Sequence, residues 1–213
     1  MKIALSYSGG KDCILALHRA IQAGHDPAAL LTTWDGDRKE SHFHRIPLEV
    51  MAEAAEKLGI PLILIKTGGE DYNRDFEGAL TDLKQQGMEA VVFGDIDIPG
   101  HLEWGRERCG NTGLEAMYPL WQEPRRQLVE EFIDAGFHAV IKVVDTRRME
   151  GKYAGSTLSH AVLDALEKEG VDVCGENGEY HTFVFDGPIF SGPVGFKKGR
   201  IMTEGFHRIL PIC

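Results

Sequence analysis

The sequence KIALSYSGGKDC at residues 2–13 decides the fold of this 213-residue chain. Its first five residues contain the apolar run Ile3–Leu5, which predicts a β-strand, and the residues after the stretch read ILALHRAI, which predicts a helix. The small residues between them predict a tight turn. Gly9 and Gly10 have no Cβ, so backbone N–H groups there approach an anion closely, and the start of the helix adds its dipole. The stretch therefore predicts a strand, a turn that binds a polyphosphate, and a helix.

The two charged residues after the glycines suit the same site. Lys11 supplies a full positive charge, and Asp12 offers carboxylate oxygens of the kind that bind a divalent cation. We therefore expect Asp12 to hold Mg²⁺ beside the phosphates. The alternative is a glycine turn that merely connects strand and helix, with an incidental Lys-Asp pair.

Composition limits the class of protein. The chain has 23 Lys and Arg against 33 Asp and Glu, a net charge of −10, which disfavours broad binding to nucleic acid. Its four cysteines form no CxxC pair, which disfavours a structural zinc site and is typical of reduced thiols. No signal sequence and no apolar run of membrane-spanning length is present. We therefore expect a cytoplasmic protein with no membrane partner.

Strand-like and helix-like segments alternate along the first two thirds of the chain. The strands are nearly all apolar, as in a parallel sheet covered on both faces, and several helices end at a glycine. This alternation predicts a doubly wound, mostly parallel α/β fold. The expected strands are 2–6, 28–33, 61–66, 90–94, 115–118 and 139–144; the expected helices are 12–23, 47–58, 72–86, 102–111 and 123–135; the glycines are Gly24, Gly59, Gly87 and Gly136.

The regular alternation of strand-like and helix-like segments ends after residue 145. A helix near 159–169 precedes a glycine-rich and aromatic region in which 182–185 and 200–202 predict short strands. We therefore predict a nucleotide-binding domain over residues 1–145 and a smaller C-terminal, substrate-binding lobe over residues 146–213.

Three loops follow strands of the predicted sheet: the glycine turn, Thr33–Asp35, and Gly94–Asp97. Ligands of doubly wound folds bind at the carboxyl ends of the strands, so we expect these loops to converge on one crevice. Asp95 and Asp97 have a second interpretation, the capping of the next helix.

The phosphate loop matches neither of two common motifs. A Walker A loop requires Ser or Thr after its lysine, and the dinucleotide fingerprint separates its first two glycines. The pattern Ser-Gly-Gly-Lys-Asp after a strand instead resembles the PP-loop of the ATP pyrophosphatases. That resemblance implies cleavage of ATP between the α- and β-phosphates, with AMP and pyrophosphate as products. It also implies contacts to the nucleotide from Ser6, Ser8, Gly9, Gly10, Lys11, Asp12 and Cys13.

A second unusual segment spans Gly175–Thr182. It sets two carboxylates, an amide and an imidazole between glycines and an apolar strand. Glu176 and Glu179 suit an ammonium, a metal or a basic group, and His181 suits general-base chemistry near neutral pH. A polar hairpin with solvated carboxylates is the alternative.

Together these motifs resemble the diphthine–ammonia ligase family of PP-loop ATPases, whose fold is of the adenine nucleotide alpha hydrolase-like (HUP) type. The resemblance implies that a substrate carboxylate, small or protein-borne, is adenylated and then amidated by ammonia. In the eponymous reaction the carboxylate is that of diphthine on translation elongation factor 2. The motifs follow in this order: the PP-loop, Gly94-Asp95-Ile96, Arg106 and Cys109, Pro119-Leu120-Trp121, and Gly-Glu-Asn-Gly-Glu-Tyr at 175–180.

The resemblance also implies site residues and alternatives. His44, Gly94 and Asp95 are expected at the nucleotide, with Arg106, Asn177 and Tyr180 at the substrate. Asn177 and His181 stand where the family usually has Gly and Glu, as in a bacterial branch linked to corrinoid amidation or salvage. A tRNA-modifying PP-loop enzyme, a non-catalytic adenine-nucleotide-binding protein and a homodimer are alternatives left open. So is metal binding by a His42/His44 pair.

Overall fold

The computed structural model describes residues 1–213 except 36–38, 42–43 and 68–70. Its contacts divide the chain into two compact units. Unit 1 comprises Met1–Ser8, Asp12–His42 and Gly59–Glu123, and unit 2 comprises Gly9–Lys11, Phe43–Leu58 and Pro124–Cys213.

Unit 1 contains a mostly parallel sheet. Strand β1 (Lys2–Ser6) lies at its centre, paired in parallel with β2 (Asp26–Asp35) and β5 (Ala90–Val92). Outside these, β4 (Leu62–Lys66) pairs in parallel with β2, and β6 (Glu115–Met117) with β5. A short strand, β3 (Glu40–Ser41), pairs antiparallel with the end of β2. The predicted α/β fold with a mostly parallel sheet is confirmed.

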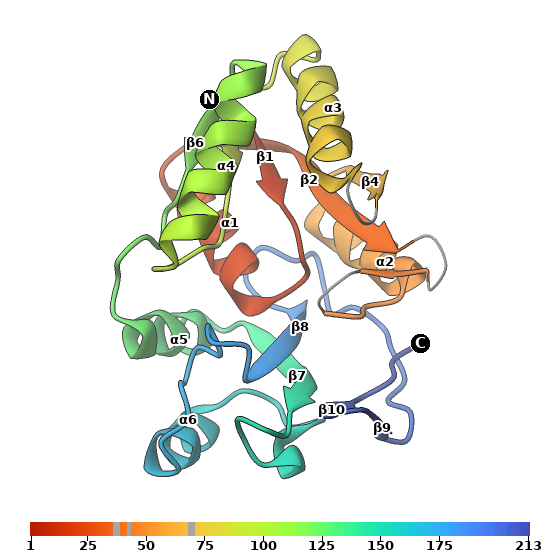
Figure 1. Ribbon diagram of the computed structural model, residues 1–213, viewed down its shortest axis with the longest axis vertical. Helices are drawn as coiled ribbons and strands as arrows, with labels where there is room; N and C mark the ends of the chain where they lie inside the picture. The colour runs from red at the N-terminus through yellow and green to blue at the C-terminus, as the bar shows by residue number, and fades with distance from the viewer. Residues whose placement is uncertain (36–38, 42–43, 68–70) are drawn as a thin grey trace. The chain divides into compact units, whose positions relative to one another are not determined.

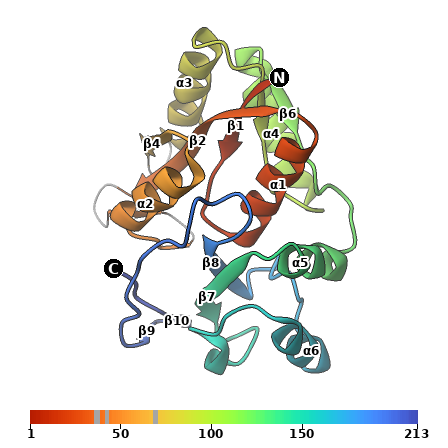
Figure 2. The same ribbon diagram turned by 180° about the vertical axis from the view of Figure 1, so that it is seen from behind.

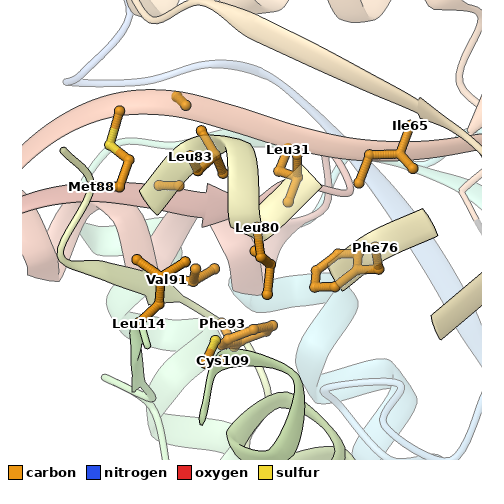
Figure 3. Packing of buried hydrophobic residues seen from close by; sticks show 12 residues of the cluster. Leu31, Ile65, Phe76, Leu80, Leu83, Met88, Val91, Phe93, Cys109 and Leu114 are labelled. Carbon is orange, nitrogen blue, oxygen red and sulfur yellow. The ribbon is translucent and has the colours of Figure 1, made fainter. Parts of the chain in front are cut away.

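Three helices cover this sheet. In Figure 1, α3 (Tyr72–Gln85) and α4 (Pro99–Thr112) lie toward the viewer, whereas α1 (Lys11–Gln22) comes to the front in Figure 2. A cluster of buried apolar residues lies between the sheet and helices α3 and α4 (Figure 3). It draws on alternate strand residues and on one face of α3, as in Leu31, Val91, Phe76, Leu80 and Leu83. Burial on both faces explains why the central strands β1 and β5 are mostly apolar.

Unit 2 contains an antiparallel sheet with the strand order β8-β7-β10-β9. Strand β7 (His138–Asp145) pairs with β8 (Tyr180–Asp186) on one side and β10 (His207–Ile209) on the other. The remaining elements are β9 (Met202–Glu204), α2 (Leu48–Leu58), α5 (Arg125–Asp134), η2 (Gly151–Tyr153) and α6 (His160–Lys168).

The sequence prediction placed residues 139–144 in the parallel sheet, and this was wrong. They form most of β7, whose partners are β8 and β10 of unit 2. A fully buried strand has the same apolar pattern in either kind of sheet, so the pattern did not distinguish them.

The units also divide at Glu123 and Pro124 rather than at residue 145. Helix α2, expected in the first domain, belongs to unit 2 because Glu53 and Lys57 accept backbone hydrogen bonds from Gly195 and Ser191. Among the described residues, no helix has both the length and the apolar character needed to cross a membrane.

Candidate functional site

The glycine turn of unit 2 is fastened to strand β8. The backbone N–H of Val184 donates to the carbonyl oxygen of Gly9 at 2.9 Å, and the backbone N–H of Lys11 donates to the Thr182 hydroxyl at 3.0 Å. Gly9 has a φ of 79°, which favours glycine at this position. The predicted phosphate loop is therefore held against the strand that carries His181 and Thr182.

His44 lies directly against this turn. A Cβ built on Gly10 would be 2.3 Å from Cε1 of His44, so only glycine fits there. Nδ1 of His44 lies 2.6 Å from the carbonyl oxygen of Thr182. A carbonyl only accepts, so Nδ1 carries a hydrogen and Nε2 is left as the acceptor of the neutral ring. The His181 ring lies 4.9 Å from that of His44, centroid to centroid.

The Lys11 side chain is buried, with 4% exposed. Its ammonium donates to the carbonyl oxygen of Cys174 and lies 5.3 Å from the centre of the Tyr180 ring. Sequence reasoning expected Lys11, His44, Tyr180 and His181 at a site, and unit 2 brings all four together.

A second lysine, Lys142 of β7, is close enough to His44 to affect its pKa, and sequence reasoning missed it. Only 1% of Lys142 is exposed, and its charge, like that of Lys11, lowers the pKa of His44. Lys152, the next lysine along the chain, is by contrast exposed and pairs with Glu150 and Glu169. The available signal was a single lysine inside the apolar run Ala139–Val144.

Burial and positive charge keep both imidazoles neutral. Burial, the nearby His181 and the two lysines lower the pKa of His44 to about 3. Burial first, and then the charges of Lys11 and His207, lower the pKa of His181 to about 4. Two lysines and two neutral imidazoles around Thr182 form an electropositive group, which we call the lysine–histidine cluster (Lys11, His44, Lys142 and His181). Such a group favours an anion.

The acidic turn before β8 is braced by its own side chains. The carboxylate of Glu179 is buried and accepts hydrogen bonds from the backbone N–H and side-chain amide of Asn177, both at 3.1 Å. Glu176 is half-buried, and its backbone N–H donates to Asp172 at 3.0 Å. Gly175 has a φ of 73°, and a Cβ there would lie 2.9 Å from the carbonyl oxygen of Tyr180. The turn is thus tightly fixed, while the catalytic roles of Glu176 and Glu179 stay predictions.

Unit 1 holds the other predicted nucleotide residues. A Cβ on Gly94 would lie 2.7 Å from the backbone nitrogen of Cys13, so the loop after β5 packs against the start of α1. The Ser8 hydroxyl lies 3.4 Å from the Cys13 thiol. Ser6 ends β1 itself, and Thr33–Asp35, expected in a loop, form the end of β2 instead.

Asp95, Arg106 and Asp12 also belong to unit 1. The carboxylate of Asp95 lies 3.0 Å from His101, and Arg106 is exposed on α4, where its charge reaches Tyr118. Asp12 stands in the first turn of α1, and no group of three or more potential ligands gathers among the described residues. His42 lies outside the described residues. The predicted roles of these residues stay predictions.

Known proteins are similar to this chain along nearly its whole length. It is 29% identical to "Diphthine--ammonia ligase" of Danio rerio, covering all of this chain and 92% of that protein. The human protein of the same name is 24% identical, with 89% of its length covered. The Schizosaccharomyces pombe protein of that name is 26% identical over 96% of this chain, which spans 36% of its length.

A solved structure titled as a predicted subunit of tRNA methyltransferase, from Methanocaldococcus jannaschii, has a TM-score of 0.47 and 16% identity. It covers 86% of this chain and 96% of that chain. Two family models match far more specifically. The diphthamide synthase N-terminal domain matches residues 1–116 and the C-terminal domain matches residues 124–210, so the chain belongs to the diphthamide synthase family.

Proposed function

We propose that this protein is an ATP-dependent ligase that adenylates a substrate carboxylate and amidates it with ammonia. Its products are the amide, AMP and pyrophosphate. Family membership and the name shared by the relatives support the reaction class. The observation that carries the proposal is the lysine–histidine cluster, because it gathers positive charge beside a glycine turn.

The cluster suits the polyphosphate of ATP. Lys11 and Lys142 provide two cations in a buried setting, where an anion is stabilised more strongly than in water. Lys11 neutralises the β- and γ-phosphates, which makes pyrophosphate the better leaving group. An oxygen of the substrate carboxylate attacks the α-phosphorus, the bond from α-phosphorus to the bridging oxygen breaks, and an acyl-adenylate forms.

Asp12 follows Lys11 in the chain and is the residue assigned to Mg²⁺. One carboxylate fits this ion, which is usually held by one or two carboxylates together with phosphate oxygens and water. When bound, Mg²⁺ offsets negative charge on the phosphates.

His181 is assigned to the amidation step. Its ring is neutral at pH 7, so it accepts a proton as ammonia attacks the acyl carbon and AMP leaves with the electrons of the broken C–O bond. Bound polyphosphate offsets the charge of Lys11, which raises the pKa of His181 and makes it a stronger base. Glu176 and Glu179 are proposed to position the acceptor or ammonia, with Asn177, Tyr180 and Arg106 assigned to the substrate.

The test is product analysis with ATP, Mg²⁺, ammonium and a panel of carboxylic acids. We expect acid-dependent formation of AMP and pyrophosphate in equal amounts, lost in Lys11→Met. Lys152→Met is the matched control because Lys152 is exposed and paired with Glu150 and Glu169. Formation of ADP and phosphate, or turnover unaffected by Lys11→Met, contradicts the proposal.

A further inference from the structure

A second positively charged site lies within unit 2, in residues that the lysine–histidine cluster does not use. It is an open pocket of about 670 Å³. Three segments line it: the residues after η2, the chain before β9, and β10. The polar side chains among them are Ser156, Lys198, Arg200 and Arg208.

The pocket contains three cations and no carboxylate in its lining. Among the described residues, neither Arg200 nor Arg208 makes an ion pair. Nε of Arg208 is buried and has no hydrogen-bond partner in the part of the chain that the structure describes. In a chain with a net charge of −10, two arginines without an acidic partner in one pocket call for an anionic ligand.

The local structure holds these cations in place. Arg208 belongs to β10, opposite Val144 of β7 and Thr203 of β9. The aliphatic part of the Arg208 side chain packs closely on Gly151. A Cβ built on Gly151 would lie 2.9 Å from Cγ of Arg208. The Lys198 ammonium donates to the carbonyl oxygen of Gly155 at 3.0 Å. Arg208 and Lys198 are therefore held in place by the folded sheet and its flanking turn.

We propose that this pocket binds the phosphate group of a small molecule. The planar guanidinium of arginine donates two parallel hydrogen bonds to phosphate, and both Arg200 and Arg208 line the pocket. The charge of a phosphate dianion matches the two unpaired arginines. The site shares no residue with the lysine–histidine cluster, so it stands or falls independently of the proposed reaction.

The test is a titration with inorganic phosphate, followed by NMR of the arginine Nε–H groups. We expect the Arg208 signal to shift and saturate in the wild type and in Lys11→Met. Arg208→Gln should weaken phosphate binding at least about tenfold, and so should Arg200→Gln at the exposed residue. Arg126→Gln is the control, since it removes the same charge from unit 2 but from a residue paired with Glu130, Asp164 and Glu167.

Separate titrations with AMP and pyrophosphate identify the source of the phosphate. A shift of Arg208 with either one assigns the pocket to a product of the proposed reaction, and a shift with inorganic phosphate alone assigns it to another phosphate compound. An Arg208 signal that stays unmoved at saturating phosphate overturns the proposal. So does affinity that is unchanged in Arg200→Gln, or that is lost in Lys11→Met.

Discussion

The imidazole of His44 occupies the space that a Cβ on Gly10 would fill, with Cε1 only 2.3 Å from that position. The ring is tied to the Thr182 carbonyl at 2.6 Å, so it does not yield without losing a hydrogen bond. Three segments far apart in the sequence thus meet at one point. The requirement for glycine at position 10 comes from this contact, since its φ lies outside the positive range that favours glycine.

We expect Gly10→Ala to weaken ATP binding at least about tenfold, because His44 must leave its place beside the turn. Isothermal titration measures the affinity. Combining Gly10→Ala with His44→Ala removes the clash, so the double variant binds ATP better than the sum of the two single losses predicts.

Gly78→Ala is the matched control, because a Cβ on this helical glycine meets nothing within 4 Å. It should leave ATP affinity unchanged and stabilise α3 by about 0.5–1 kcal/mol. Additive losses in the double variant would contradict the steric account of position 10.

Gly94→Ala should destabilise the protein. Its Cβ would lie 2.7 Å from the backbone nitrogen of Cys13, and backbone at the start of α1 has little freedom to move. We expect a loss of about 1–3 kcal/mol in the free energy of unfolding, measured in urea. Gly100→Ala, where a Cβ meets nothing within 4 Å, provides the comparison. Equal stability of the two variants would argue against this close packing.

The two imidazoles should make the folded state less stable in mild acid. Burial is the first cause that lowers the pKa of His181 to about 4 and of His44 to about 3, below the usual 6.5. Between pH 6.5 and 4 the unfolded chain therefore binds protons that the folded chain does not, so stability falls as pH falls. His181→Gln should flatten this slope in urea unfolding.

NMR titration of the His181 ring checks the same account directly. The ring should remain neutral at pH 5, and a non-hydrolysable ATP analogue should raise its pKa by offsetting the charge of Lys11. A pKa near 6.5 without nucleotide, or one that nucleotide lowers, would contradict the assignment.

Most elements of the fold were predictable because their signals are local. Apolar runs marked the parallel strands, and the four glycines expected to end helices, Gly24, Gly59, Gly87 and Gly136, all have positive φ. The pairing of β7 was not predictable in this way. Its partner β8 begins at Tyr180, and no local pattern records which distant strand completes a sheet.

The residues of the candidate site also differ in whether a local sequence pattern predicts them. The phosphate loop and the turn before β8 are continuous motifs, so Lys11 and His181 were found from the sequence. Lys142 was not, because a lysine in a strand usually indicates an exposed edge. Its burial depends on the contacts of β7 with β8 and β10, which form only in the folded chain.

Lys142→Met tests the residue that sequence reasoning missed. Methionine nearly keeps the length of the side chain and removes the charge, so the pKa of His44 should rise and ATP affinity should fall at least about tenfold. NMR and calorimetry measure the two effects. Lys152→Met should change neither, and an unchanged His44 pKa in Lys142→Met would remove Lys142 from the cluster.

The most direct test of an acyl-adenylate is the fate of a carboxylate oxygen. An acid that supports turnover is labelled with ¹⁸O in its carboxylate, and the products formed with ATP, Mg²⁺ and ammonium are examined by ³¹P NMR. An acyl-adenylate leaves one labelled oxygen in the phosphate of AMP and none in pyrophosphate, because the carboxylate attacks the α-phosphorus. Label in inorganic phosphate with release of ADP, or AMP free of label, would contradict it.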